Sequence, residues 1–445
     1  MSAPQKMAVT ILALCSALVP VRLSAEILPT EGRDLLPPPV YQSMQTWMLN
    51  ERFDGWLFTG QGTFADIERE LLGLKGQTRH RWFIFYAALS SLHQPFLIYH
   101  PDDEPLFAGV KFYPLPYHSY AEMVQTIKNN VFSVARDIAI NYSSKLEISE
   151  VSQVDLGTVE LLQEIGFRFR PAGSMLSFYH TRWTTGEVES HKYAAARLDS
   201  ILPVAVENIR DRLIRGKKIT DYDLARHIEK NLKKLDLEAT SPVVVAVGAN
   251  TLVEGYLPAK DAKIEIGPDS LVYIEVSARK RGEPGTMFAR LGWTLVCSDS
   301  VKPGMKKAWG NIVAAADTAL AILSNRVGTN TPLTGREVDE AARKLLGPKP
   351  DALPRPLGYN LNRQGNHYGV RFDSYLFVDD RIIMPGLGFT LEPGIYGNKY
   401  ALRVCNNLFL EGSREVTLSA PLQRKLIPVL GDPSLLVEAF TPPLD

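Results

Sequence analysis

Hydrophobic positions follow two spacings in the first third of the chain. Short runs of aromatic and β-branched residues predict strands at residues 55–58, 82–86, 95–99 and 137–141. Between them, apolar residues that recur every three to four positions predict helices at 41–50, 121–134 and 154–165. Strands that alternate with helices are typical of an α/β domain, which we place at residues 41–184.

The rest of the chain begins with a long amphipathic pattern and ends in short strands. Apolar residues at helical spacing predict one helix over residues 187–214, and Thr220 is the expected N-cap of the next helix. Strand-like runs and two further helices follow, at 242–247, 271–276, 288–296, 308–325 and 334–346. From about residue 368 onward short strands and turns prevail. We therefore expect an α+β domain over 185–445 with one curved antiparallel sheet.

The N-terminus differs from both domains. Lys6 precedes an apolar run from Met7 to Val19, and small residues follow at Ser24 and Ala25. This pattern predicts a signal peptide over residues 1–25, since a membrane span needs about 20 apolar residues. The alternative is a disordered or packed arm. We expect a proline-rich linker over 26–40 and an exported protein, periplasmic or secreted and otherwise cytoplasmic, with no membrane span once the signal is removed.

Composition narrows the possible partners. Hydrophobic residues make up 45% of the chain and charged residues 22%, as in globular proteins. Lys plus Arg and Asp plus Glu number 49 each, so no net charge attracts nucleic acid. Cys297 and Cys405 are far apart in sequence and form neither a disulfide framework nor a zinc-type motif.

One segment resembles a known family. Residues 385–396 read Pro-Gly-Leu-Gly-Phe-Thr-Leu-Glu-Pro-Gly-Ile-Tyr. The strand that ends in Glu392-Pro393-Gly394 resembles a metal-ligand strand of the Xaa-Pro peptidase family, which includes prolidase, aminopeptidase P, methionine aminopeptidase and creatinase. Residues 266–275 resemble the turn and strand that carry the family's first metal-binding acid. The resemblance implies a pita-bread fold for the second domain and a homodimer.

The resemblance also implies a site. Active members hold two divalent metals with two Asp, one His and two Glu, because hard cations prefer carboxylate oxygen and paired metals activate a bridging water. Glu275 and Glu392 retain an acid at two of these positions. The other family positions, including two further histidines over the site, fall at or near Gly255, Met287, Asn366, Asp373 and Cys405. His367 lies one residue after the expected metal-binding histidine, and a β-bulge could restore its register.

Two functions remain open from these residues. The first is a divergent member that has lost the dinuclear site and, without a cofactor, binds a peptide or small amide ligand. The alternative is an active hydrolase: an Xaa-Pro aminopeptidase or dipeptidase holding Mn, Co, Fe or Zn, or a metal-free creatinase-like C–N hydrolase. The catalytic residues would be Glu275, Glu392 and His367.

The charged residues allow more than one interpretation. Glu275 and Glu392 could form an acid/base pair, but the simpler interpretation is that Arg290 or Arg403 neutralises them in an ion pair. Cys405 could be a nucleophile beside Arg403, although a buried thiol in place of a ligand is the simpler expectation. Asp373 and the pair Asp379-Asp380 are expected to mark exposed turns.

Overall fold

The computed structural model describes residues 30–36, 38–62, 69–70, 73, 76–89, 94–347, 352–363, 368–412 and 415–440. The predicted signal peptide lies outside these residues, as does part of the linker. No helix in the described ranges is both long enough and apolar enough to cross a membrane. The chain divides into two compact units. The N-terminal unit comprises Met1–Ala139 and Asp155–Arg170, and the C-terminal unit comprises Ile140–Val154 and Pro171–Asp445.

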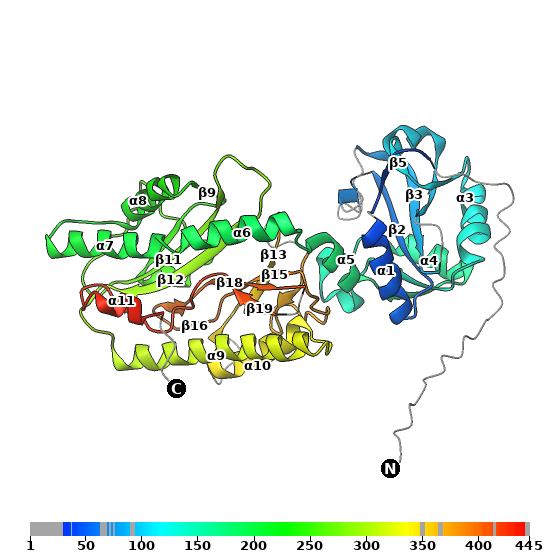
Figure 1. Ribbon diagram of the computed structural model, residues 1–445. Helices are drawn as coiled ribbons and strands as arrows, with labels where there is room; N and C mark the ends of the chain where they lie inside the picture. The colour runs from blue at the N-terminus through cyan, green and yellow to red at the C-terminus, as the bar shows by residue number, and fades with distance from the viewer. Residues whose placement is uncertain are drawn as a thin grey trace, which may run out of the picture. The chain divides into compact units, whose positions relative to one another are not determined.

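The N-terminal unit is built on a six-stranded sheet with the order β6-β4-β3-β2-β7-β8 (Figure 1). Its strands are β2 (Gly55–Gly62), β3 (Thr78–Ala87), β4 (Phe96–Tyr99), β6 (Tyr113–Pro116), β7 (Asp137–Ile140) and β8 (Arg168–Pro171). Its helices include α1 (Pro38–Asn50), α3 (Tyr120–Ile127) and α4 (Leu156–Ile165). Gly166 ends α4 in the left-handed conformation, with a φ of 112°. The predicted α/β character is confirmed.

The C-terminal unit contains two five-stranded sheets and a short hairpin. The first sheet has the order β10-β11-β12-β20, with β9 beside β11, and the second has the order β14-β13-β15-β18-β19. The first comprises β9 (Leu237–Ala239), β10 (Val244–Val247), β11 (Leu271–Lys280), β12 (Ala289–Val296) and β20 (Ile427–Pro428). The second comprises β13 (Gly358–Leu361), β14 (Arg371–Phe372), β15 (Gly388–Leu391), β18 (Asn406–Leu410) and β19 (Val416–Leu418). The hairpin pairs β16 (Gly394–Tyr396) with β17 (Ala401–Arg403).

The two sheets meet at one backbone bridge. Gly292 on β12 pairs antiparallel with Cys405, which lies between β17 and β18. The predicted curved sheet is thus realised as two mostly antiparallel sheets joined at this bridge. Helices cover them from two sides, with α6 to α8 on one side and α9 and α10 on the other (Figure 1). These helices are α6 (Thr185–Leu198), α7 (Ile201–Ile214), α8 (Asp221–Lys234), α9 (Pro303–Gly328) and α10 (Gly335–Leu346).

The single helix predicted over residues 187–214 is wrong in one respect, because the structure divides it into α6 and α7. Thr184 caps α6 in a reciprocal capping box with Glu187. Pro203 has no backbone N–H to donate, and it lies in the first turn of α7, where that donor has no partner within the helix. Both helices bury their apolar faces in one core, which is why the apolar pattern continues across the break.

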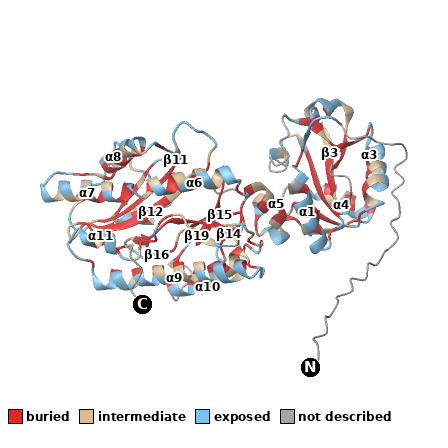
Figure 2. Ribbon diagram, in the orientation of Figure 1, coloured by how far each residue is buried: buried red, intermediate tan, exposed pale blue. Residues whose placement is uncertain are grey.

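Side chains of β11 alternate between the two faces of the sheet, and this alternation decides which of them can form a site away from α6 and α7. Val272, Ile274 and Val276 belong to the core that α6 and α7 cover, as do Leu291 and Trp293 on β12. Successive side chains of a strand point to opposite faces. The intervening residues, among them those at 273, 275 and 290, therefore face away from these helices. Figure 2 shows both strands largely in the colour of buried residues.

Candidate functional site

An acid and a guanidinium meet on the face of β11 and β12 that lies away from α6 and α7. Arg290 on β12 pairs in register with Ser277, so it stands diagonally across from Glu275 on the same face. Arg290 Nε lies 2.9 Å and Nη2 lies 2.8 Å from Glu275 Oε1. Directly opposite Glu275 is Gly292, where a Cβ would come within 2.4 Å of the Tyr273 hydroxyl. Strand register therefore fixes the pair, and Gly292 leaves room for the Tyr273 hydroxyl beside it.

A second acid reaches the same guanidinium. Glu392 follows β15, and its backbone N–H donates to the carbonyl of Leu357 at 2.6 Å. Its Oε1 lies 3.5 Å from Arg290 Nη1. Ligand-type atoms of Glu275, Glu392 and Cys405 all lie within 4.8 Å of one another. The structure thus brings both predicted acids together around one arginine, as the ion-pair interpretation expects.

A tyrosine and a second arginine complete the cluster. The Tyr273 hydroxyl donates to Glu275 Oε2 at 2.6 Å, so both carboxylate oxygens of Glu275 are engaged. Arg403 on β17 lies over the Tyr273 ring, 4.0 Å from its centroid. Tyr273 is not among the site residues predicted from the sequence. Its position two residues before Glu275, and thus on the same face of the strand, was the available signal.

The charges in this cluster stabilise one another. Burial raises the pKa of Glu275, but Arg290 and Arg403 outweigh it and leave that pKa below its ordinary value. Burial opposes the charge on Arg290, yet Glu275 and Glu392 hold its pKa well above the ordinary value. Burial, with Glu392 adding to it, raises the pKa of the Cys405 thiol well above its usual range. The thiol is therefore protonated at neutral pH and is a poor nucleophile.

The family model named metallopeptidase family M24 matches residues 189–411, just over half of the chain. The chain belongs to this family. The matched residues include β11, β12 and the segment around Glu392, so the M24 match covers the whole cluster described above.

Solved structures with the same fold agree with the M24 assignment. The dipeptidase PepE from Mycobacterium ulcerans is 16% identical, with a TM-score of 0.57 over 89% of this chain and 100% of that chain. The N-terminal domain of the FACT complex subunit SPT16 from chickpea is 13% identical, with a TM-score of 0.53 over 88% and 98%. A dipeptidase from Pyrococcus horikoshii is 17% identical, with a TM-score of 0.50 over 87% and 99%. No curated protein matches. These likenesses confirm the pita-bread fold.

Apart from Asp373, the remaining M24 positions inferred from the sequence hold an apolar side chain or a glycine, or lie beyond the described residues. Met287 precedes β12 and is buried in an apolar cluster with Trp183, Leu361 and Phe409. Gly255 is exposed, with a φ of 63°. Asn366 and His367 lie outside the described residues, so their register stays a prediction.

Asp373 has a structural explanation. Its carboxylate accepts the backbone N–H groups of Tyr375, Leu376 and Phe377 at 2.8, 3.0 and 3.0 Å. The expectation of an exposed turn holds for Tyr375 and Leu376 but not for Asp373 itself, whose fully buried carboxylate replaces water as the partner of the turn's backbone N–H groups. Burial raises its pKa despite these hydrogen bonds. Asp379 is also buried, paired with Arg381 at 2.6 Å, whereas Asp380 is exposed.

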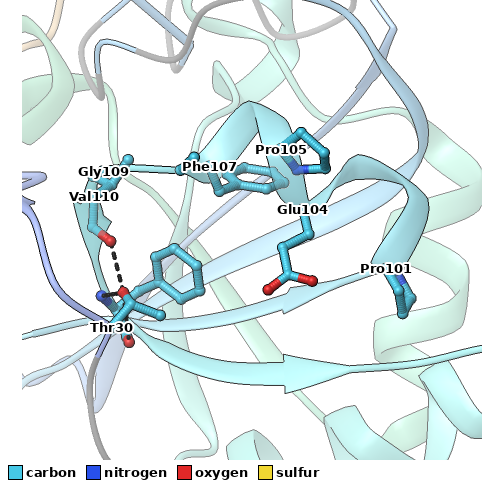
Figure 3. Close-up of a pocket in the computed structure, with 9 residues that line it drawn as sticks. Thr30, Pro101, Glu104, Pro105, Phe107, Gly109 and Val110 are labelled. Carbon is cyan, nitrogen blue, oxygen red and sulfur yellow. Dashed lines mark hydrogen bonds between the residues drawn. The ribbon is translucent and has the colours of Figure 1, made fainter.

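The N-terminal unit contains a separate surface hollow (Figure 3). Phe107 and Phe112 line it together with Glu104, and Thr30 closes one side by donating its hydroxyl to the carbonyl of Val110 at 2.6 Å. None of the site residues inferred from the family lies in this hollow.

Proposed function

We propose that this M24 chain has lost the dinuclear metal centre of its relatives and uses the Glu275–Glu392 cluster to bind a peptide or small amide ligand. The observation that carries the proposal is the position of Arg290, which lies 2.8 Å from Glu275 and 3.5 Å from Glu392. A guanidinium keeps its charge at any physiological pH. The cation that balances the two carboxylates is thus part of the chain.

The donor set does not fit two divalent ions. Two carboxylates carry two negative charges, which Arg290 and Arg403 already balance, and no surplus remains to offset two metals. The thiol of Cys405 would have to lose its proton to bind a metal, against its raised pKa. A single ion held by Glu275, Glu392 and Cys405 would also have to displace Arg290 from both carboxylates.

Two polar atoms in the cluster support an amide ligand. Glu392 Oε1 and Arg403 Nε are buried and make no hydrogen bond within the part of the chain that the structure describes, although Glu392 Oε1 is within ion-pair range of Arg290 Nη1 at 3.5 Å. A buried acceptor or donor without a hydrogen bond costs free energy, and an amide ligand would offer an N–H to the acceptor and a C=O to the donor. The side chains of Glu275, Glu392 and Arg290 are 11%, 17% and 23% exposed, so the cluster is not completely closed to solvent.

A metal-free hydrolase is one form of the active-hydrolase alternative, and no observation favours it. An acid/base pair requires one carboxyl whose pKa is raised toward neutrality. The pKa of Glu275 is shifted in the opposite direction, so Glu275 does not fit the role of the acid. Turnover would therefore have to come from Glu392 with His367, which lies outside the described residues.

Metal content and turnover test the proposal together. The protein would be loaded with Mn²⁺ and Co²⁺, dialysed and analysed by mass spectrometry beside a Glu392→Gln variant, with an active prolidase treated in parallel. We expect wild type and Glu392→Gln to retain equal metal and neither to hydrolyse Xaa-Pro dipeptides. Two equivalents that Glu392→Gln loses, or hydrolysis that this variant abolishes, would overturn the proposal.

Binding is the third measurement. Calorimetry with Xaa-Pro dipeptides and simple amides should give heat with wild type. Arg403→Met should weaken the interaction, because it removes the unpartnered donor. A ligand that binds wild type and Arg403→Met equally well would contradict the assignment of the ligand to this cluster.

A further inference from the structure

Three histidines lie close together in the N-terminal unit, which is not the unit that holds the M24 cluster. The antiparallel pairing of β3 with β4 sets Phe83 opposite Ile98, which brings His80, near the start of β3, beside His100, just after β4. Their rings are stacked with centroids 3.9 Å apart and an interplanar angle of 26°. The His118 ring lies 6.3 Å from that of His100.

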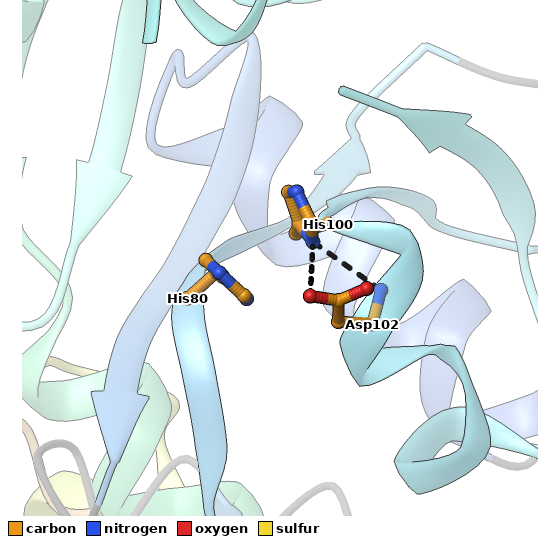
Figure 4. A group of neighbouring side chains, drawn as sticks. All are labelled: His80, His100 and Asp102. Carbon is orange, nitrogen blue, oxygen red and sulfur yellow. Dashed lines mark hydrogen bonds and ion pairs between the residues drawn. The ribbon is translucent and has the colours of Figure 1, made fainter. Parts of the chain in front are cut away.

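We propose that His80, His100 and Asp102 form a binding site for one divalent transition-metal ion of the Zn²⁺ type (Figure 4). One ligand atom from each residue lies within 4.8 Å of the other two. Asp102 Oδ2 is 3.6 Å from His100 Nδ1. In a tetrahedral site with bonds of about 2.0–2.1 Å, ligand atoms are about 3.4 Å apart. A contraction of at most about 1.4 Å would therefore bring the three atoms onto one ion.

The donor types select the class of metal. Imidazole nitrogen suits Zn, Cu, Ni and Fe, whereas Mg²⁺ and Ca²⁺ prefer sites made of oxygen alone. Two imidazoles and one carboxylate leave a fourth tetrahedral position for water or an exogenous ligand. His80 and His100 are half-buried and Asp102 is exposed, so an ion can enter from solvent.

A buried carboxylate prepares one of the ligands. Asp103 Oδ2 lies 3.2 Å from His80 Nδ1, and its carboxylate also accepts the backbone N–H groups of Arg79 and His80 at 2.8 Å each. Metal-binding histidines commonly donate their second ring N–H to such a partner. The bond to Asp103 places the proton on Nδ1 and leaves the Nε2 lone pair for the ion. Asp103 is thus a positioning residue.

His100 has its lone pair on the side of Asp102. The backbone N–H of Asp102 donates to His100 Nδ1 at 3.3 Å, which identifies this nitrogen as the acceptor. The Asp102 carboxylate approaches the same nitrogen. A cation bound by this nitrogen and by the Asp102 carboxylate would take over the lone pair and replace the hydrogen bond from the Asp102 backbone N–H. A proton shared in an ordinary histidine–aspartate ion pair would do the same, and the experiment must separate the two.

Zinc binding to the intact chain is the test. The full-length protein would be stripped with chelator and titrated with ZnCl₂ by calorimetry. Co²⁺ would serve as a second probe, because tetrahedral nitrogen and oxygen coordination gives intense visible absorption. We expect one equivalent of Zn²⁺, and we expect His100→Ala and His80→Ala to weaken it at least about tenfold, since loss of an outer partner alone costs roughly 10–100-fold.

Matched variants locate the ion. His227→Ala in the C-terminal unit should bind as wild type does, and Cys405→Ser should too, which separates this site from the M24 cluster. Asp102→Asn removes an exposed carboxylate without disturbing the fold and should also weaken binding. Failure to bind Zn²⁺, or equal binding by wild type, His80→Ala and His100→Ala, would show that these residues form only proton-mediated ion pairs and would overturn the proposal.

Discussion

Replacing Arg290 by methionine isolates the contribution of the chain's own cation. Methionine keeps an unbranched apolar stem but removes the guanidinium that contacts Glu275 and Glu392. At an effective dielectric constant of ~20, unit charges 2.8 and 3.5 Å apart attract by about 6 and about 5 kcal/mol before desolvation is subtracted. Breaking a buried pair from one side costs about 3–5 kcal/mol in the free energy of unfolding, which is the loss we expect at pH 7.5.

This cost should depend on pH. In wild type the pKa of Glu275 is below its ordinary value of 4.5, so the stabilisation is present above about pH 4.5 and is lost as the pH falls through the lowered folded-state pKa. Without Arg290, burial dominates and the pKa of Glu275 rises. Acid then protonates the unpaired Glu275 carboxylate and removes the cost of burying its charge in Arg290→Met. The difference between wild type and Arg290→Met should therefore be largest near neutral pH and shrink toward pH 4.

Urea unfolding at pH 7.5, 5.5 and 4.5, followed by tryptophan fluorescence, measures the difference. Trp293 on β12 reports on the strand that carries Arg290. The matched control is Arg215→Met, which removes an exposed pair with Asp211 at 2.7 Å and should cost about 0.3–0.5 kcal/mol at every pH. If Arg290→Met cost no more than the control, or if its cost did not change with pH, the assignment of Arg290 as the balancing cation would be refuted.

Three further predictions concern His191, the two buried cysteines and Gly292. His191 is buried between the Phe288 carbonyl and Ser419, and burial lowers its pKa from 6.5 to about 4. The free energy of unfolding should therefore fall by about 3 kcal/mol as the pH drops from 6.5 to 4. Urea unfolding of His191→Gln over the same pH range should show a smaller loss. Cys297 and Cys405 are buried and their thiol pKa values are raised. A thiol reagent should therefore modify them only after denaturation, and peptide mass spectrometry would detect the modification. Gly292→Ala should cost about 1–3 kcal/mol in urea unfolding, because the new Cβ would meet the buried Tyr273 side chain.

Local patterns predicted the elements well. The N-cap signal at Thr220 located the start of α8, and short aromatic runs located β3 and β4. The failures came from tertiary structure. The break between α6 and α7 is invisible in the apolar pattern, because both helices face one core. Asp373 looked like a surface residue because it precedes an exposed turn, and no sequence signal shows that its carboxylate lies buried beneath the backbone N–H groups of that turn.

The site was predictable in its members but not in its geometry. Glu275 and Glu392 stood out by family resemblance, and Arg290 was considered as their partner. The Arg290 guanidinium reaches both acids because Ser277 pairs with Arg290 and because Gly292 bridges to Cys405, and neither pairing can be read from the sequence. The histidines at 80 and 100 went unnoticed because the register of β3 against β4 brings them together.

The position of Arg290 also bears on how the protein reaches its native state. In a metal-dependent relative, clustered acids repel one another until an ion arrives, so folding is linked to the supply of that ion. Here β11 and β12 are joined by a short hairpin, and each new copy of the hairpin carries one acid together with its counterion. Maturation of this cluster is therefore expected to proceed at the same rate whether or not divalent ions are plentiful, and chelators should leave it intact.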